Sequence, residues 1–194
     1  VFGSGEIAVI LTHMRGRDQT SWFPFARFIA ESGYKVLTFD FRGYGKSTGI
    51  KDTRMDRDLE AAIAYMRAKG AQQVVLIGAS MGGTAVIELA SESQVQGVAA
   101  LSPPAEFGRI NALTAVESMV IPLLLIVSEN DYQYYSDARK IESAAAATQF
   151  LVVEGQQHGT NMIAEHRNEI FANLLAFLDR WTDDRLLTTV QTES

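Results

Sequence analysis

Cysteine is absent from this chain of 194 residues. Its absence excludes thiol catalysis, disulfide bonds and cysteine-ligated metal sites, and it leaves the redox compartment open. No apolar run reaches the roughly 18 residues of a membrane-spanning helix, so we expect a soluble protein, either cytoplasmic or secreted. Methionine is also missing from the first position, and we expect that a signal peptide or another upstream segment preceded Val1.

Positive charge is in deficit, because 17 Lys and Arg residues face 23 Asp and Glu residues, for a net charge of -6. This balance argues against a nucleic acid or an anionic membrane as partner, although a local basic pocket remains compatible with it. The length suits one domain with a substantial core, and we expect it over residues 1–182, followed by a polar tail over 183–194. The sequence leaves the oligomeric state open, with a monomer as one option.

Phosphate-binding and metal-binding motifs are missing as well. The segment GYGKSTG contains Gly-Lys-Ser, but Asp40 stands where a phosphate-binding loop requires its first glycine. The segment GASMGG has Ser80 at the second glycine of the dinucleotide-binding motif. No His, Asp or Glu cluster has metal-ligand spacing, so we predict neither a metal nor another cofactor. Asp40 and Arg42 are interpreted as partners in local hydrogen bonds of a structural loop.

Short apolar, β-branched runs alternate with segments of helical period along the chain. The expected strands are 7–13, 34–41, 73–79, 95–102, 122–129 and 148–155. The expected helices are 23–32, 53–69, 81–92, 134–147 and 162–181, with a short one at 108–118. Thr53 and Asp56 resemble a capping box at the start of the second helix. Helices between successive strands predict an α/β three-layer sandwich, a mostly parallel sheet of about six strands covered by helices on both faces.

One serine stands between glycines at the end of an expected strand, in Gly78-Ala79-Ser80-Met81-Gly82. A sharp turn from strand to helix would project the Ser80 hydroxyl from the carboxyl edge of the sheet, where ligands bind in such folds. The Met81 N–H at the helix start could then face an oxyanion. The alternative is an ordinary turn in which Ser80 caps the helix.

A nucleophilic serine needs a base, and the chain has three histidines. His166 lies within the last expected helix, where it is expected to face solvent. His13 ends the first strand and is equally compatible with a structural role. His158 lies in the loop GQQHGT, directly after the sixth strand and at the same sheet edge as Ser80, and is the preferred candidate.

The base in turn needs a carboxylate to orient it. Asp131 follows the fifth strand at the same edge, whereas Glu129 falls within the strand end and Asp137 one turn into the next helix. A capping role is the alternative for Asp131. Serine, acid and histidine thus occur in the order found in nucleophile-elbow hydrolases, each after a different strand.

Over nearly its whole length the sequence resembles the α/β-hydrolase superfamily. The segments that carry the resemblance are THMRGRDQTSWFPFARFIAESGYKVLTFDFRGYGKSTG, IGASMGG, SENDY and GQQHG. The resemblance implies Ser80 as nucleophile, Asp131 as acid and His158 as base. It also implies an oxyanion hole formed by the N–H of Met81 and an N–H after the first strand, for which Met14 is preferred and Arg15 is the alternative.

Two departures from the family pattern shape the expected site. Only residues 1–6 precede the first strand, so the first two strands of the family are expected to be missing. The gap between Pro103 and Pro122 is too short for a cap domain, which predicts a shallow, lidless site. The substrate pocket is expected to involve four residues, Met14, Met81, Trp22 and Tyr132.

The predicted function is that of a cofactor-free serine hydrolase of the carboxylesterase type, acting on small-molecule esters with short acyl groups. Thioester, lactone or peptide hydrolysis by the same triad are alternatives, as is a non-catalytic binding domain with this fold. Arg15 and Arg17, beside the expected oxyanion loop, are interpreted as solvated, with attraction of an anionic substrate as the alternative.

Overall fold

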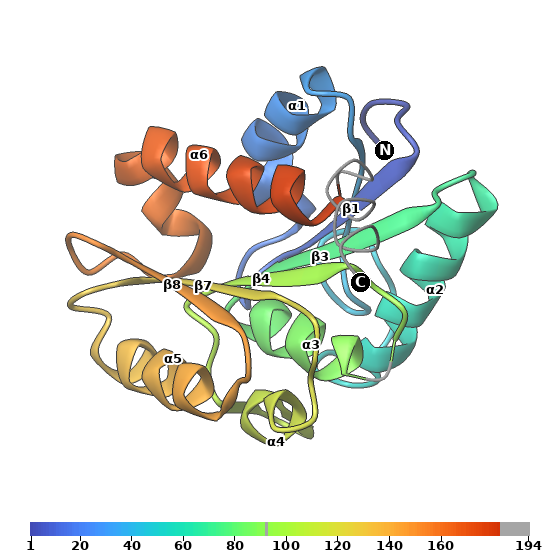
Figure 1. Ribbon diagram of the computed structural model, residues 1–194. Coiled ribbons are helices and arrows are strands. Elements are labelled where there is room, and N and C mark those ends of the chain that lie inside the picture. The colour runs from blue at the N-terminus through green and yellow to red at the C-terminus, as the bar shows by residue number, and fades with distance from the viewer. Residues whose placement is uncertain (92, 183–194) are drawn as a thin grey trace, which may run out of the picture.

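The computed structural model describes residues 1–91 and 93–182, so the predicted tail over 183–194 lies outside the described residues. At its centre is a sheet of six strands in the order β2-β1-β3-β4-β7-β8, in which every neighbouring pair is parallel (Figure 1). The strands are β1 (Ile7–Thr12), β2 (Lys35–Phe39), β3 (Gln73–Ala79), β4 (Gly97–Leu101), β7 (Leu123–Ser128) and β8 (Thr148–Val153). The predicted parallel sheet is confirmed.

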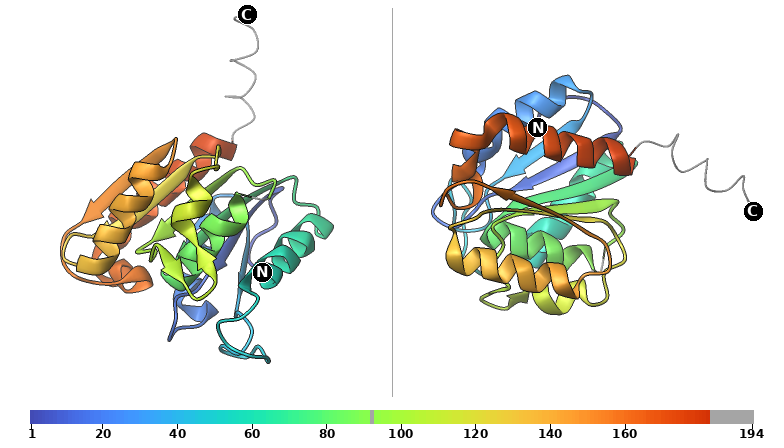
Figure 2. Two further views of the ribbon diagram at one scale, coloured as in Figure 1. Left: turned by 90° about the horizontal axis from the view of Figure 1, so that it is seen from below. Right: turned by 60° about the vertical axis from the view of Figure 1, so that its left-hand side comes forward.

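Helices cover both faces of this sheet, which confirms the three-layer α/β fold (Figures 1 and 2). They are α1 (Phe23–Glu31), α2 (Met55–Ala68), α3 (Met81–Ala90), α4 (Ala112–Val116), α5 (Tyr132–Ala144) and α6 (Ile163–Thr182). Residues of α1 and α6 belong to one core cluster, and those of α2, α3, α4 and α5 to the other. No helix within the described residues is long and apolar enough to cross a membrane.

The strand β1 illustrates why the central strands are apolar throughout. Ala8 and Ile10 are buried in the cluster under α2 and α3, whereas Val9 and Leu11 are buried in the cluster under α1 and α6. Successive side chains of a strand point to opposite faces of the sheet, so a strand covered on both faces needs apolar residues at every position.

The strand order places the loop after β1 and the segment after β4 on either side of the carboxyl end of β3. The segment after β4 forms a small hairpin, β5 (Glu106–Phe107) and β6 (Ile110–Asn111), followed by α4. The predicted short helix at 108–118 is therefore split between this hairpin and α4. In the described chain, these three short elements are the only ones between β4 and β7, so no cap domain is inserted here.

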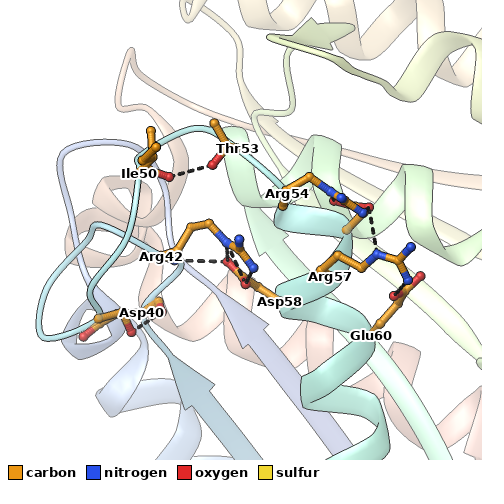
Figure 3. Close-up of polar contacts among 10 residues, drawn as sticks. Asp40, Arg42, Ile50, Thr53, Arg54, Arg57, Asp58 and Glu60 are labelled. Atoms are coloured by element: carbon orange, nitrogen blue, oxygen red, sulfur yellow. Dashed lines mark hydrogen bonds and ion pairs between the residues drawn. The ribbon is translucent and has the colours of Figure 1, made fainter.

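The long loop between β2 and α2 is held by an ion pair instead of the expected capping box. The Thr53 hydroxyl donates to the carbonyl of Ile50, and α2 begins after Arg54 without a side-chain cap, so the capping-box prediction is wrong. The Arg42 guanidinium instead contacts both carboxylate oxygens of Asp58 in α2 (Figure 3). Such a two-point contact fixes the loop against the helix.

Candidate active site

Ser80 occupies the junction between β3 and α3, where the chain reverses within one residue. Its backbone has φ 50° and ψ -120°, a conformation that a residue with a Cβ rarely adopts. The Ser80 N–H donates to the carbonyl of Leu101 at the end of β4, at 2.8 Å. A strained turn of this kind is the geometry of a nucleophile elbow, and it persists only because the surrounding sheet and helix hold it.

The flanking glycines allow the backbone of α3 to approach the end of β1 so closely that no Cβ would fit between them. A Cβ added to Gly82 would lie 2.7 Å from the carbonyl oxygen of His13, and one added to Gly78 would lie 2.6 Å from Thr12 Oγ1. Neither distance is tolerated between nonbonded heavy atoms. The Thr12 hydroxyl uses this proximity to donate to the carbonyl of Gly82 at 3.1 Å. The glycines therefore serve backbone packing rather than a positive φ.

The structure brings together His158 and Asp131, two residues singled out from the sequence. His158 Nδ1 lies 2.8 Å from Asp131 Oδ2, and both side chains are largely buried. A proton on Nδ1 donated to this carboxylate leaves Nε2 free as an acceptor. The ring of Tyr134, in the first turn of α5, packs against the imidazole with centroids 4.0 Å apart. Tyr134 was not among the residues predicted from the sequence.

Two serines fix the backbone on either side of His158. The Ser128 hydroxyl, at the end of β7, donates to the carbonyl of Gln157 at 2.6 Å. The Ser102 hydroxyl, directly after β4, accepts from the N–H of Gly159 at 3.1 Å. Both serines are fully buried, and Ser102 has φ 48°. Neither serine was predicted from the sequence, although each ends or follows an apolar run at the same sheet edge as Ser80.

The loop of the histidine lies against the turn of the serine. A Cβ added to Gly159 would lie 3.5 Å from the Ala79 Cβ, one residue before Ser80. Among the described residues, however, no hydrogen bond joins the Ser80 hydroxyl to His158. Such contacts are often long in structures without substrate and shorten when substrate binds.

Met81 directly follows Ser80 at the start of α3, and Met14 lies in the loop after β1. Within the described residues, neither of their N–H groups donates to another backbone group, and the same holds for Arg15. The Met14 side chain is nearly buried, and its sulfur accepts from the Thr160 hydroxyl at 3.4 Å. This contact ties the loop after β1 to the loop that carries the histidine.

Two side chains expected in the pocket are not at the surface. Trp22 is fully buried, and its Nε1 donates to the carbonyl of Thr12 at 2.8 Å, so it supports the end of β1 instead of lining a pocket. The Met81 side chain is also fully buried, in the core beneath α3. These two predictions need correction, whereas Tyr132 is 79% exposed at the start of α5.

His13 is a structural histidine in this arrangement. Its ring is fully buried, with Nδ1 2.9 Å from the carbonyl of Met14 and Nε2 accepting from the N–H of Phe41 at 3.1 Å. These partners assign the proton to Nδ1. Burial lowers the pKa of His13 from its usual value near 6.5, opposed by the Met14 carbonyl and by Asp40. A neutral His13 thus links the loops after β1 and β2.

The competing acids have other partners. Asp137 accepts from the N–H of Ala105 and from Lys140, and Glu129 accepts from Asn130. His166 Nδ1, in α6, lies 3.8 Å from Glu169 Oε2, and its side chain is only 20% exposed, so it does not face solvent as expected. Across the described residues, no group of three or more His, Asp or Glu side chains could hold a metal ion.

A family model described as alpha/beta hydrolase fold matches residues 7–138. The chain belongs to this family, as its sequence resemblance predicted. Among curated proteins it is similar to a 2-hydroxy-6-oxononadienedioate/2-hydroxy-6-oxononatrienedioate hydrolase of Klebsiella pneumoniae, with 36% identity over 90 residues, 44% of this chain and 31% of the relative. The hydrolase of the same name from Burkholderia vietnamiensis is 34% identical over 93 residues, 45% of this chain and 32% of the relative. These matches span about a third of the length of the curated relatives.

Solved structures of hydrolases share the fold. The monoacylglycerol lipase of Paleococcus ferrophilus has a TM-score of 0.80 at 17% identity, covering 93% of this chain and 97% of that one. An esterase of Pyrococcus furiosus has a TM-score of 0.76 at 23% identity, covering 92% and 83%. The enol-lactonase of Burkholderia xenovorans has a TM-score of 0.75 at 15% identity, covering 88% and 90%. At these identities the likeness concerns the fold alone.

Proposed function

We propose that this protein is a serine hydrolase of the carboxylesterase type, with Ser80 as nucleophile, His158 as base and Asp131 as the acid that orients it. The observation that carries the proposal is the contact of 2.8 Å between His158 Nδ1 and Asp131, on a loop packed against the strained turn of Ser80. Hydrolases of esters and lactones among the proteins of the same fold are consistent with this reaction class.

In the proposed mechanism, the Ser80 oxygen attacks the carbonyl carbon of an ester while His158 Nε2 takes its proton. The tetrahedral oxyanion accepts hydrogen bonds from the N–H groups of Met81 and Met14. The carbon–oxygen bond to the alcohol then breaks, and the leaving oxygen takes the proton from His158. Water, deprotonated by the same nitrogen, attacks the acyl-enzyme and releases the acid and Ser80.

Asp131 has an electrostatic and a geometric role in this cycle. Its carboxylate accepts from Nδ1 and so keeps the imidazole in the tautomer whose Nε2 is unprotonated. It also stabilises the positive charge that His158 acquires once it has taken the serine proton. The side chain of Asp131 is only 10% exposed, so water weakens this interaction little.

Short acyl groups are the preferred substrates in this proposal. Between β4 and β7 the chain contributes only the hairpin β5–β6 and the five residues of α4, too little for a cap domain. Without such a domain, a long acyl chain would remain exposed to water and would contribute little binding free energy. Tyr134, whose ring packs against His158, and the exposed Tyr132, both at the start of α5, are the aromatic side chains proposed to line the site.

Labelling with a fluorophosphonate probe tests the proposal, because the probe reacts with an activated serine and forms a stable adduct. The wild-type protein should be labelled at Ser80, as peptide mass spectrometry would show, and Ser80→Ala should not. The conservative variants His158→Gln and Asp131→Asn should label far more slowly. Equal labelling of Ser80→Ala would contradict the assignment of the nucleophile.

A panel of substrates separates the ester reaction from its alternatives. Ethyl butyrate, its thioester analogue, a butyrolactone and a butyryl anilide share one acyl length and differ in the leaving group, which is an oxygen, a sulfur, an oxygen tethered to the acyl chain and a nitrogen, respectively. The proposal expects the highest kcat/KM for the oxygen ester. A folded protein that neither labels nor hydrolyses any of them would be a binding domain.

A further inference from the structure

A polar cavity of about 580 Å³ opens beside the proposed oxyanion loop. Its walls come from the loop after β1, which contributes Arg15 and Arg17, and from the loop after β2, which contributes Tyr44 and Lys51. Asp18 is the acidic residue of its lining. The cavity therefore gathers three cationic side chains around one anionic side chain, in a protein whose net charge is -6.

The positive charges of this cavity are incompletely neutralised. Lys51 Nζ lies over the ring of Tyr44, 4.9 Å from its centroid, and Arg17 donates to the amide oxygen of Asn161 at 2.8 Å. In the described part of the chain, neither cation has a carboxylate within ion-pair distance. Asp18 is itself engaged, because its carboxylate accepts from the N–H and the hydroxyl of Thr20.

Arg15 has one carboxylate partner and free donors. Its guanidinium lies 3.3 Å from Asp52, whose carboxylate also accepts from the Tyr44 hydroxyl, and the Arg15 side chain remains 67% exposed. A guanidinium has five N–H donors in a planar fork that matches a carboxylate, so its contacts with Asp52 and Tyr44 leave further donors available. Arg15 thus retains the capacity to bind a second anion.

The position of Arg15 relates the cavity to the proposed nucleophile. Arg15 directly follows Met14, whose N–H is one of the two proposed oxyanion donors, and its guanidinium lies 5.8 Å from the ring centroid of Phe107 in β5. The loop after β1 and the segment after β4 flank the carboxyl end of β3. Arg15 therefore connects the two segments on either side of the Ser80 turn.

We propose that this cavity, with Arg15 and Lys51 as its principal donors, binds a carboxylate carried by the substrate, so that the protein acts preferentially on anionic esters. The inference rests on the serine-hydrolase function proposed above and adds a substrate class to it. A carboxylate held by Arg15 also positions the ester carbonyl, since the guanidinium and the proposed oxyanion N–H of Met14 belong to consecutive residues.

Matched pairs of esters test this substrate class. Monoethyl succinate and ethyl butyrate have acyl groups of equal length and differ by a terminal carboxylate. 4-Acetoxybenzoate and 4-acetoxybenzamide carry the same difference in the leaving group. The wild-type protein should show a higher kcat/KM for the anionic member of at least one pair, and the pair concerned assigns the carboxylate to the acyl or the alcohol half. The preference should decrease in 0.5 M NaCl, because the site is exposed.

The variants Arg15→Gln and Lys51→Gln should each lower the ratio of anionic to neutral kcat/KM by about tenfold, the effect of one lost charge-assisted hydrogen bond. Arg57→Gln is the matched control. Arg57 is 61% exposed and pairs with Glu60 on α2, outside the cavity, so this variant removes the same charge and should retain the wild-type ratio (Figure 3).

The outcomes separate the two proposals. Fluorophosphonate labelling of Ser80 without an anionic preference in either pair would overturn the carboxylate site and leave the serine hydrolase intact. The same conclusion would follow if Arg15→Gln and Lys51→Gln changed the ratio no more than Arg57→Gln. Absence of labelling together with absence of hydrolysis would overturn both proposals.

Discussion

Three serines lie at the carboxyl ends of the buried strands β3, β4 and β7, and their environments differ. Ser80 has no hydrogen-bond partner for its hydroxyl among the described residues, whereas the Ser102 hydroxyl accepts from Gly159 and the Ser128 hydroxyl donates to Gln157. An engaged hydroxyl holds structure, and an unengaged hydroxyl at a strained turn is available for chemistry. The contrast separates the proposed nucleophile from the two positioning residues.

Removal of the Ser128 hydroxyl should disturb the proposed base without removing any group that touches substrate. In Ser128→Ala the carbonyl of Gln157 loses its donor, and the freedom that His158 gains should lower kcat roughly tenfold, since catalytic rates are sensitive to displacements of about 1 Å. KM should change little. Steady-state kinetics on ethyl butyrate measures the split between kcat and KM.

Ser128→Thr serves as the control, because it retains the hydroxyl and suits a strand. It should recover most of the wild-type kcat. If Ser128→Ala changed only the melting temperature and left kcat unchanged, Ser128 would be a structural residue without influence on catalysis.

His13 should contribute a pH dependence of stability that is independent of catalysis. Its pKa is lowered in the folded protein by burial, so below about pH 6.5 the unfolded chain binds a proton that the folded protein does not. The free energy of unfolding should therefore fall as the pH decreases from 7 to 5, with a slope of up to about 1.4 kcal/mol per pH unit from this group.

Urea unfolding at pH 5, 6 and 7 measures this contribution against His13→Gln. The variant should be less stable at pH 7, because the contacts to Phe41 and Met14 are lost or weakened, but its stability should change less between pH 7 and 5. Parallel pH dependences of the two proteins would show that His13 titrates alike in the folded and unfolded states.

At the scale of elements, the approach of α3 to β1 decides the geometry of the candidate site. Gly82→Ala places a Cβ 2.7 Å from the carbonyl oxygen of His13, so α3 must move away from β1, with an expected cost of about 1–3 kcal/mol. Because α3 begins with Met81, the same movement should displace its N–H and reduce fluorophosphonate labelling of Ser80.

Gly83→Ala is the matched change one residue further along α3. Its Cβ would lie 3.3 Å from the Gly78 carbonyl oxygen and from the side chains of Ala100 and Pro103, contacts that shifts of a few tenths of an ångström relieve, and alanine favours the helix by about 1 kcal/mol. Urea unfolding should therefore show a smaller loss for Gly83→Ala than for Gly82→Ala. Equal losses would mean that the close approach to β1 is not the limiting contact.

The central strands and helices were predictable from the sequence because the periodicity of their apolar residues matches the pattern of buried side chains in each element. β3, for example, was predicted at 73–79 and observed at Gln73–Ala79. The predictions that were wrong concern side chains whose hydrogen-bond partner is not determined by the neighbouring sequence. The Thr53 hydroxyl donates to the carbonyl of Ile50, which precedes it, and does not cap α2. Trp22, an aromatic residue after a glycine-containing loop, donates to the carbonyl of Thr12 at the end of β1.

The contact between Asp131 and His158 was predictable for the same reason that the strands were. Residues that directly follow parallel strands meet at one sheet edge, so Asp131 and His158 could be paired from order alone. The hydrogen bonds of Ser102 and Ser128 to the His158 loop were not predicted. No sequence feature of a serine at a strand end distinguishes a hydroxyl that holds a neighbouring loop from one that is exposed. The short pairing of Phe2 with Val36, beside β2, was equally invisible without coordinates.

At the scale of the whole molecule, the distribution of charged residues indicates the charge of the substrate, whereas the net charge does not. The net charge of -6 argues against polyanionic partners, yet Arg15, Arg17 and Lys51 gather at one cavity beside the proposed site. A local field opposite in sign to that of the protein can attract a small anion while the remaining surface repels large ones. Net charge and substrate charge are therefore separate questions in this chain.

The absence of a cap layer within the described residues should also determine how the protein responds to dispersed substrates. Lids that close over a site make hydrolysis rise abruptly when substrate forms a second phase, because the interface stabilises the open state. Here Pro103 to Pro122 carry only β5, β6 and α4, and α3 contacts each of them. Because no lid has to open over the site, the rate of tributyrin hydrolysis should rise with tributyrin concentration along a single hyperbola, with no step at the solubility limit. A stepwise rise in rate at that limit would show that this segment moves as a lid.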